Sequence, residues 1–310
     1  MGERESWAVA VARQDGEACR RRLLERGLLD RSLRVRADGD RLILPVLEPV
    51  DGAVRASFSA HAPRPELPRH ELVGGIAILP EPDPAAARLL LASRPSITTV
   101  VSPEGHVEGP YRTRRFVVLA GEPTTVTEVR EHGLVFRVDL AEVYFSARLS
   151  TERQRLAGLV QQGERVLDMF AGAGPFALAL ARHAGFVAAS DINPAAVAAM
   201  IENCRQNRAR NVLPVLADAA RLPGVFARPF DRVVMNLPLS PLPFLPVAFA
   251  LCRPGGTIHL YHLQSAGGEA LPALEPFSVA GVAEHRVRTY SPGRWHAVYD
   301  ILIGAEIPGR

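Results

Sequence analysis

Residues 165–194 read RVLDMFAGAGPFALALARHAGFVAASDINP, and this stretch decides the fold of the C-terminal half. A short apolar run leads into Asp168, and a turn of small residues containing Gly172 and Gly174 follows. An apolar helical run then precedes a second apolar strand that ends at Asp191. Strand, glycine turn, helix, strand and terminal acid form the nucleotide-cradling unit of a doubly wound, mostly parallel sheet. The stretch therefore predicts an α/β, Rossmann-like domain.

The residues around the glycine turn favour a methyl donor over a dinucleotide. Glycines let the backbone approach a ligand closely, and Asp191 is placed to bind two ribose hydroxyls. A pyrophosphate fingerprint needs a third glycine, but Pro175 and Phe176 follow Gly174. The carboxylate of Asp168 would repel a phosphate but attract the α-amino group of S-adenosylmethionine. A glycine pair alone is equally compatible with an ordinary tight turn. The residues after the later strands decide between a tight turn and a donor-binding loop.

Polar residues also follow the next two predicted strands. NVLPVLADAARL predicts a strand ending at Asp218, which is placed to accept a hydrogen bond from the amine of an adenine, and FDRVVMNLP predicts one ending at Asn236. Open α/β sheets bind ligands at the carboxyl ends of their parallel strands. The residues expected at this edge are Asp168, Gly172, Gly174, Asp191, Asp218 and Asn236.

Size and composition indicate a soluble protein of two or three domains. The 310 residues are 47% hydrophobic and 22% charged. There is no apolar run of membrane-spanning length and no signal-like N-terminus, so a cytoplasmic location is expected. The three cysteines lack CxxC spacing and the nine histidines lack ligand spacing, so no metal site is expected.

All 36 basic residues are arginine, and the net charge is only +3. Any nucleic-acid surface must therefore come from folded patches rather than a basic tail. Two clusters are candidates, and each has an ordinary alternative. Arg20–Arg22 on a predicted helix favour a solvated face over a phosphate contact, and Arg112, Arg114 and Arg115 fit an exposed strand edge as well as an RNA contact.

Changes in composition predict three domains. Residues 1–62 form a small α/β unit with a strand over 7–12, a helix ending at Gly27 and a hairpin over 33–46; the proline-rich segment HAPRPELPRH predicts a linker near 60–70. Residues 63–150 contain strands, hairpin turns and one helix, which indicates an α+β domain. The third domain, 151–310, opens with a helix that carries Glu152 in its first turn. There the helix dipole favours an anion, so capping electrostatics alone could also explain this residue.

Together, these motifs resemble the archaeal and eukaryotic type of tRNA (guanine-37-N1)-methyltransferase. The resemblance covers nearly the whole chain: GLLDRSLRVRADGDRLILPV, GPYRTRRFVVLAGE, LVFRVDLAEVYFSARLSTERQR, VLDMFAGAGPF, DINP, ADA and MNLP. It implies an enzyme that methylates guanine N1 beside the anticodon, and we expect the chain to act as a monomer. The first domain would bind the tRNA elbow, the second would recognise the anticodon arm with the third, and the third would bind S-adenosylmethionine.

The resemblance also implies a role for each matching residue. Glu152 would be the general base that removes the N1 proton, and Arg112 would stabilise charge on the guanine O6, with Asn236 as a third catalytic residue. A sulfonium methyl is already activated, so the reaction needs no metal. The family commonly has proline where Ala147 stands and an acid near Pro110, so the local backbone around Arg112 and Arg148 is expected to differ from the family's. The residues expected to hold the donor are Arg153, Asp168, Gly172, Gly174, Asp191, Ile192, Asp218, Ala219 and Asn236.

Several other functions remain compatible with parts of the sequence. The nearest is the related transferase that moves the aminocarboxypropyl group of the same donor; FSARLSTER, GAGPF and NLP are similar to the methyl branch instead. A dual activity on the wybutosine precursor is a second alternative. A non-catalytic tRNA-binding protein and a dinucleotide oxidoreductase are disfavoured by the complete set of strand-tip residues and by Asp168 with Pro175, respectively.

Overall fold

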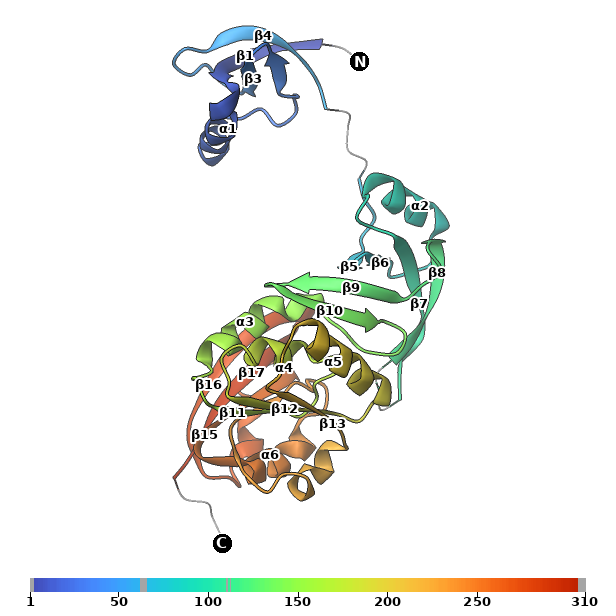
Figure 1. The fold of residues 1–310 in the computed structure, drawn as a ribbon, viewed down its shortest axis with the longest axis vertical. Helices are drawn as coiled ribbons and strands as arrows, with labels where there is room; N and C mark the ends of the chain where they lie inside the picture. The colour runs from blue at the N-terminus through green and yellow to red at the C-terminus, as the bar shows by residue number, and fades with distance from the viewer. Residues whose placement is uncertain (1–2, 62–65, 110, 112, 306–310) are drawn as a thin grey trace. The chain divides into compact units, whose positions relative to one another are not determined.

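The computed structural model describes residues 3–61, 66–109, 111 and 113–305, and the chain forms two compact units, Met1–Glu66 and Leu67–Arg310 (Figure 1). The boundary falls inside the predicted linker at 60–70, of which residues 62–65 lie outside the described part. The first 66 residues thus pack as a unit of their own, and the predicted domain end at residue 62 stays a prediction.

The first unit is an antiparallel sheet with one helix. Its elements are β1 (Glu3–Ala12), α1 (Gly16–Glu25), β2 (Arg36–Asp38), β3 (Arg41–Val46) and β4 (Val54–Ser59). The strand order is β2-β3-β1-β4. Side chains alternate along β3, so Leu44 and Val46 pack with Cys19 of α1 while Ile43 lies in a separate apolar cluster. The predicted hairpin strand at 33–36 is displaced to Arg36–Asp38, because Leu33 enters that second cluster and bridges Ala60.

The second unit contains a seven-stranded, mostly parallel sheet. Its strands are β11 (Arg165–Asp168), β12 (Phe186–Asp191), β13 (Val212–Leu216), β14 (Phe230–Met235), β15 (Cys252–Gln264), β16 (Val279–Ser291) and β17 (Arg294–Ile303). The order is β13-β12-β11-β14-β15-β17-β16, with β17 antiparallel to both of its neighbours. The five parallel strands form the doubly wound sheet that the sequence predicts, and the last two strands extend it as an antiparallel pair.

Helices cover both faces of this sheet (Figure 1). They are α3 (Ser150–Leu159), α4 (Pro175–Leu180), α5 (Pro194–Gln206) and α6 (Leu245–Leu251). One apolar cluster joins α3, α4 and α5 to Val166, Val234 and Tyr261, and a second joins α6 to Leu167 and Leu260. Neighbouring residues of a strand thus enter different cores, as expected for strands buried on both faces.

The segment before α3 packs within the same unit. It contains β5 (Glu71–Val73), β6 (Ile76–Ile78), α2 (Pro84–Ser93), β7 (Thr99–Glu108), β8 (Thr113–Gly121), β9 (Val126–Glu131) and β10 (Leu134–Asp139). β5 to β8 form one sheet, and β9 pairs with β10. The side-chain amide oxygens of Asn203 on α5 and of Asn207, the residue just after α5, accept hydrogen bonds from the Arg137 and Val135 N–H groups of β10, respectively. Buried residues on both sides of residue 150 belong to one apolar cluster, so the structure shows no separate core on each side of it. The predicted domain boundary at residue 150 stays a prediction.

Substitution of Gly174 by alanine is expected to destabilise the glycine turn by about 1–3 kcal/mol. Gly174 has a φ of +85°, and an added Cβ would lie 2.9 Å from both Leu178 Cδ1 and Met200 Cγ. Thermal unfolding should show a fall in Tm of several degrees. Gly158 of α3 is the matched control, because a Cβ there meets nothing within 4 Å. A Gly174→Ala variant as stable as Gly158→Ala would contradict this account of the turn.

Candidate active site

The predicted strand-tip residues converge at the carboxyl edge of the parallel strands. Asp168 is in register with Ala189 of β12 and Val234 of β14. Asp191 lies two positions beyond Ala189, and Asn236 two positions beyond Val234. Because side chains alternate along a strand, these three polar groups lie on the face covered by α3, α4 and α5.

Asp168 is a fully buried carboxylate with unused hydrogen-bonding capacity. Its Oδ1 accepts one long hydrogen bond, 3.4 Å, from the Phe170 N–H, and its Oδ2 has no partner among the described residues. Burial, with the nearby charge of Asp191, raises the pKa of Asp168 to about 7. A buried, unpaired carboxylate is costly unless a ligand supplies a cation or a donor, so this group favours a positively charged ligand.

Asp191 ties the glycine turn to the tip of β12. Its Oδ2 accepts a hydrogen bond of 2.7 Å from the Gly172 N–H, and its Oδ1 accepts one of 2.9 Å from the Asn193 N–H. Burial raises the pKa of Asp191 although these hydrogen bonds oppose the shift. Gly172 and Gly174 have φ angles of +55° and +85°, which are left-handed conformations that glycine adopts readily. The sequence thus correctly places the turn and Asp191 side by side.

The remaining predicted donor residues lie around this edge with different exposures. Asp218 accepts a hydrogen bond from the Ala220 N–H at the start of a short 3-10 helix, Ala219–Gly224, in which Ala219 is buried. Ile192 is 42% exposed. Asn236 is half-buried, and its side chain makes no hydrogen bond with the part of the chain that the structure describes. Ile192 and Asn236 therefore remain available to a ligand.

Glu152 lies on the same sheet face. It is 7% exposed, and its Oε1 accepts hydrogen bonds from the Tyr261 hydroxyl at 2.7 Å and from Arg155 Nη2 at 2.8 Å. Arg155 Nε donates to Oε2 at 2.9 Å. Leu260 is in register with Met235, so Tyr261 is level with Asn236. The geometry thus brings Glu152 to the candidate edge through Tyr261, a contact that the sequence did not predict.

The structure does not place Arg153 or Arg112 as a ligand-binding side chain. Arg153 is 1% exposed, and its guanidinium makes a bidentate ion pair with Glu131 of β9 at 2.6–2.7 Å and donates to the Ser146 carbonyl. Its donor contact stays a prediction, and the contacts that it makes here position α3. Arg112 and Pro110 lie outside the described residues.

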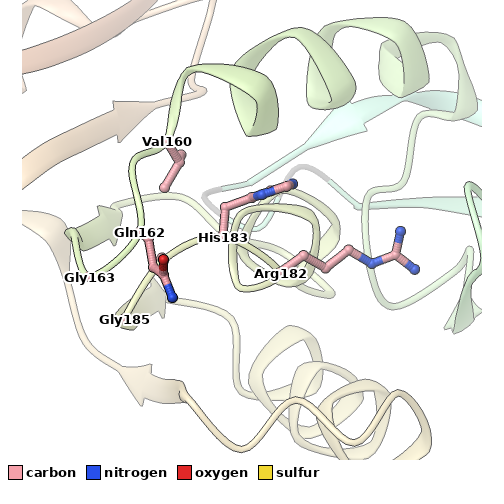
Figure 2. Close-up of a pocket in the computed structure, with 7 residues that line it drawn as sticks. Val160, Gln162, Gly163, Arg182, His183 and Gly185 are labelled. Atoms are coloured by element: carbon pink, nitrogen blue, oxygen red, sulfur yellow. The ribbon is translucent and has the colours of Figure 1, made fainter.

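A separate hollow of about 490 Å³ lies at the opposite edge of the sheet (Figure 2). It is lined by Gln162 and Gly163 before β11 and by Arg182, His183 and Gly185 before β12. Arg182 donates to the carbonyl of His132. Because these residues precede the strands, the hollow is not part of the carboxyl-edge site.

The described residues contain neither a candidate metal site nor a candidate membrane-spanning helix. They contain no group of three or more His, Cys, Asp or Glu side chains arranged to hold a metal ion. No helix in the same residues is long and apolar enough to cross a membrane.

The titration of Asp168 should make the stability of the unliganded protein depend on pH. Because its folded-state pKa is about 7, above the ordinary 3.8, the folded state binds more protons than the unfolded state between these values. Stability should therefore fall as pH rises from about 4 to 7, by no more than about 4 kcal/mol. In an Asp168→Asn variant, thermal unfolding should show a smaller fall in stability between pH 4 and 7, because the titrating carboxyl is absent. An identical pH dependence in parent and variant would contradict it.

Comparison with known proteins identifies the family and the fold. Residues 127–279 match the TRM5/TYW2 methyltransferase domain, and residues 8–54 match the tRNA methyltransferase 5 N-terminal domain. The tRNA (guanine(37)-N(1))-methyltransferase Trm5b of Pyrococcus abyssi is 35% identical over 96% of this chain and 98% of its own length. Its crystal structure aligns with a TM-score of 0.74, at 33% identity, over 96% of this chain and 99% of that one.

Two further relatives bear on substrate. The structure of a complex of aTrm5 and tRNALeu aligns with a TM-score of 0.73, at 26% identity, over 96% of this chain and all of that chain. The tRNA 4-demethylwyosine(37)-methyltransferase Taw21 of Saccharolobus solfataricus is 32% identical over 75% of this chain and 93% of its own length. The resemblance inferred from the sequence motifs is confirmed: the chain belongs to the Trm5 family of tRNA (guanine-37-N1)-methyltransferases.

Proposed function

We propose that the chain transfers a methyl group from S-adenosylmethionine to N1 of guanosine 37 in tRNA, with Glu152 as general base. The observation that carries this proposal is the unpaired, buried carboxylate of Asp168 at the sheet edge to which Tyr261 also brings Glu152. A cationic ligand bound at Asp168 and a proton-accepting Glu152 would thereby lie on one face of the sheet. Both are needed for methylation of a weakly acidic ring nitrogen by a sulfonium donor.

The residues at the carboxyl edge fit S-adenosylmethionine. The unsatisfied Oδ2 of Asp168 suits the α-amino group or the positive charge of the donor. Asp191 would bind the ribose hydroxyls, Asp218 the adenine amine, and Ile192 and Ala219 the adenine ring. When bound, the donor supplies a methyl group activated by a sulfonium sulfur.

Glu152 is held in an orientation that suits a proton acceptor. Among the described residues, its Oε1 accepts two hydrogen bonds and its Oε2 accepts one, which would leave a lone pair of Oε2 for the guanine N1 proton. The free amide of Asn236 would hydrogen-bond the guanine, and Arg112 would stabilise the negative charge that develops on O6 as N1 loses its proton.

Recognition of tRNA would involve both units. The family match of residues 8–54 and the solved tRNA complex of a relative support a role for the N-terminal unit at the tRNA elbow, with the second unit on the anticodon arm. Arginines would make the phosphate contacts, since the chain has no lysine. We propose that the enzyme acts as a monomer.

The direct test is methyl transfer from labelled S-adenosylmethionine to unmodified tRNA transcripts. A transcript with guanosine at position 37 should be labelled, and one with adenosine there should not. Labelling of both transcripts, or of neither, would contradict the proposal.

A second candidate function is methylation of the wybutosine precursor at the same position. The match to Taw21 over 93% of that protein favours it. It would add to the first activity rather than replace it, because the Trm5b match extends over 96% of this chain, compared with 75% for Taw21. A tRNA carrying 4-demethylwyosine at position 37 tests it: methyl transfer to this nucleoside would establish the second activity, and no transfer would remove it.

A further inference from the structure

Glu152 is one end of a chain of buried and half-buried charged groups. Arg155, which donates to both of its carboxylate oxygens, also donates to Asp300 of β17, from Nη1 to Oδ2 at 2.8 Å and from Nη2 to Oδ1 at 3.3 Å. One guanidinium is therefore shared between two carboxylates. Asp300 lies beyond Glu152, the group proposed to take the proton, and the proposed reaction does not by itself require this arrangement.

The hydrogen bonds of His259 fix its protonation. Arg232 Nη1 lies 2.6 Å from His259 Nε2, and a guanidinium can only donate, so Nε2 accepts. Nδ1 must then carry the proton that it donates to Asp300 Oδ1 at 2.6 Å. Complete burial lowers the pKa of His259, which agrees with a neutral ring. His259 thus orients Asp300 without neutralising its charge.

Arg155 is left as the cation that two anions share. Although burial opposes it, the hydrogen bonds from His259 and Arg155 hold the pKa of Asp300 well below its ordinary value. Burial also opposes the charge on Arg155, yet Glu152 and Asp300 raise its pKa above the ordinary value. Arg155 and Asp300 therefore both stay charged at every pH at which the enzyme would be assayed.

We propose that Arg155 and Asp300 are positioning residues that set how readily Glu152 accepts a proton, with opposite effects. Arg155 fixes the direction of the carboxylate and stabilises its charge. Asp300 withdraws part of that stabilisation by competing for the same guanidinium, and its own negative charge favours a protonated Glu152. The pair thus exerts two opposing effects on the affinity of the Glu152 carboxylate for the N1 proton. This inference rests on the proposed function of Glu152 as the base.

The groups that face the two carboxylates come from several elements. Arg155 of α3 and the Tyr261 hydroxyl of β15 face Glu152; burial and the charge of Glu152 raise the pKa of that hydroxyl, so it remains a donor. Arg155, His259 of β15 and His285 of β16 face Asp300, with His285 Nε2 at 3.5 Å from Oδ2. His285 is about half exposed, so its substitution serves as a control in the test.

The test is the pH profile of the single-turnover methyl-transfer rate, measured with saturating donor and tRNA for the full chain. Loss of the negative charge in Asp300→Asn should move the midpoint of the acid limb to lower pH by about one unit and lower the plateau rate. Loss of the positive charge in Arg155→Gln should move the midpoint to higher pH by a similar amount. Shifts in the same direction, or no shift in either variant, would overturn the proposal.

Two controls separate this proposal from a structural effect. Arg253→Gln removes an exposed ion pair with Asp231 and should leave the midpoint unchanged. His285→Gln should also leave it unchanged, and disappearance of the limb in that variant would overturn its assignment to Glu152. If Asp300→Asn does not fold, the comparison of Arg155→Gln with Arg155→Lys tests the proposal. The midpoint of the acid limb should then move to higher pH by more in Arg155→Gln than in Arg155→Lys. A parent chain without methyl transfer would instead refute the proposed function.

Discussion

A Glu152→Gln variant is expected to transfer methyl groups at least about 100-fold more slowly than the parent chain, with unchanged donor affinity. Glutamine keeps the size of the side chain and an oxygen that can accept from Tyr261 and Arg155, but it cannot take the guanine N1 proton. Because Arg155 also binds Asp300, it retains a partner in this variant. Single-turnover rates with a guanosine-37 transcript, with the donor Kd from calorimetry, measure the two effects separately.

Glu202→Gln is the matched control for this experiment. Glu202 is an exposed glutamate on α5 whose one ion pair within the described part of the chain is with Arg205 at 3.8 Å, so its substitution should change neither rate nor donor affinity. Thermal unfolding of Glu152→Gln checks that the variant is folded. A folded variant with the parent rate would remove Glu152 as the base.

The second large effect is expected for donor binding in Asp168→Asn. Asparagine preserves the shape of the buried side chain but removes the charge that we assign to the donor's cation. A hydrogen bond to a charged group contributes about 1.5–3 kcal/mol, so the donor Kd should rise by roughly 10- to 100-fold. Asp231→Asn is the control, because Asp231 lies at the amino end of β14, at the opposite edge of the sheet, and should leave the Kd unchanged.

Donor binding should also depend on pH through Asp168. Its pKa of about 7 in the unliganded protein means that the carboxyl becomes neutral as pH falls below this value. A cationic ligand prefers the ionised form, so the donor Kd should rise as pH is lowered from 8 to 6 in the parent chain but not in Asp168→Asn. Equal affinities of parent and variant at pH 8 would contradict the placement of the donor beside Asp168.

The sheet edge was predictable because its signals are local. Each apolar strand is followed within a few residues by a glycine, an acid or an amide, and parallel strands meet at one edge. Gly172, Asp191, Asp218 and Asn236 could therefore be placed together from the sequence alone. The hydrogen bond from the Gly172 N–H to Asp191 realises that local pattern.

The surroundings of Glu152 were not predictable in the same way. The hydrogen bond from Tyr261 joins residues 109 positions apart, and the pairing of Arg153 with Glu131 depends on how α3 packs against β9. One signal was present: Arg155 follows Glu152 by three positions, a spacing that brings helix side chains together. Its second partner, Asp300, required the antiparallel placement of β17 beside β15, which no short motif specifies.

The measurement that tests the central claim most directly is the identity of the nucleoside made by the parent chain. Unmodified tRNA transcript with guanosine at position 37 is incubated with S-adenosylmethionine, digested to nucleosides and examined by mass spectrometry against a 1-methylguanosine standard. We expect a gain of one methyl group on that guanosine and co-elution with the standard. No methyl group, a methyl on another atom or residue, or the larger gain of an aminocarboxypropyl group would contradict the account.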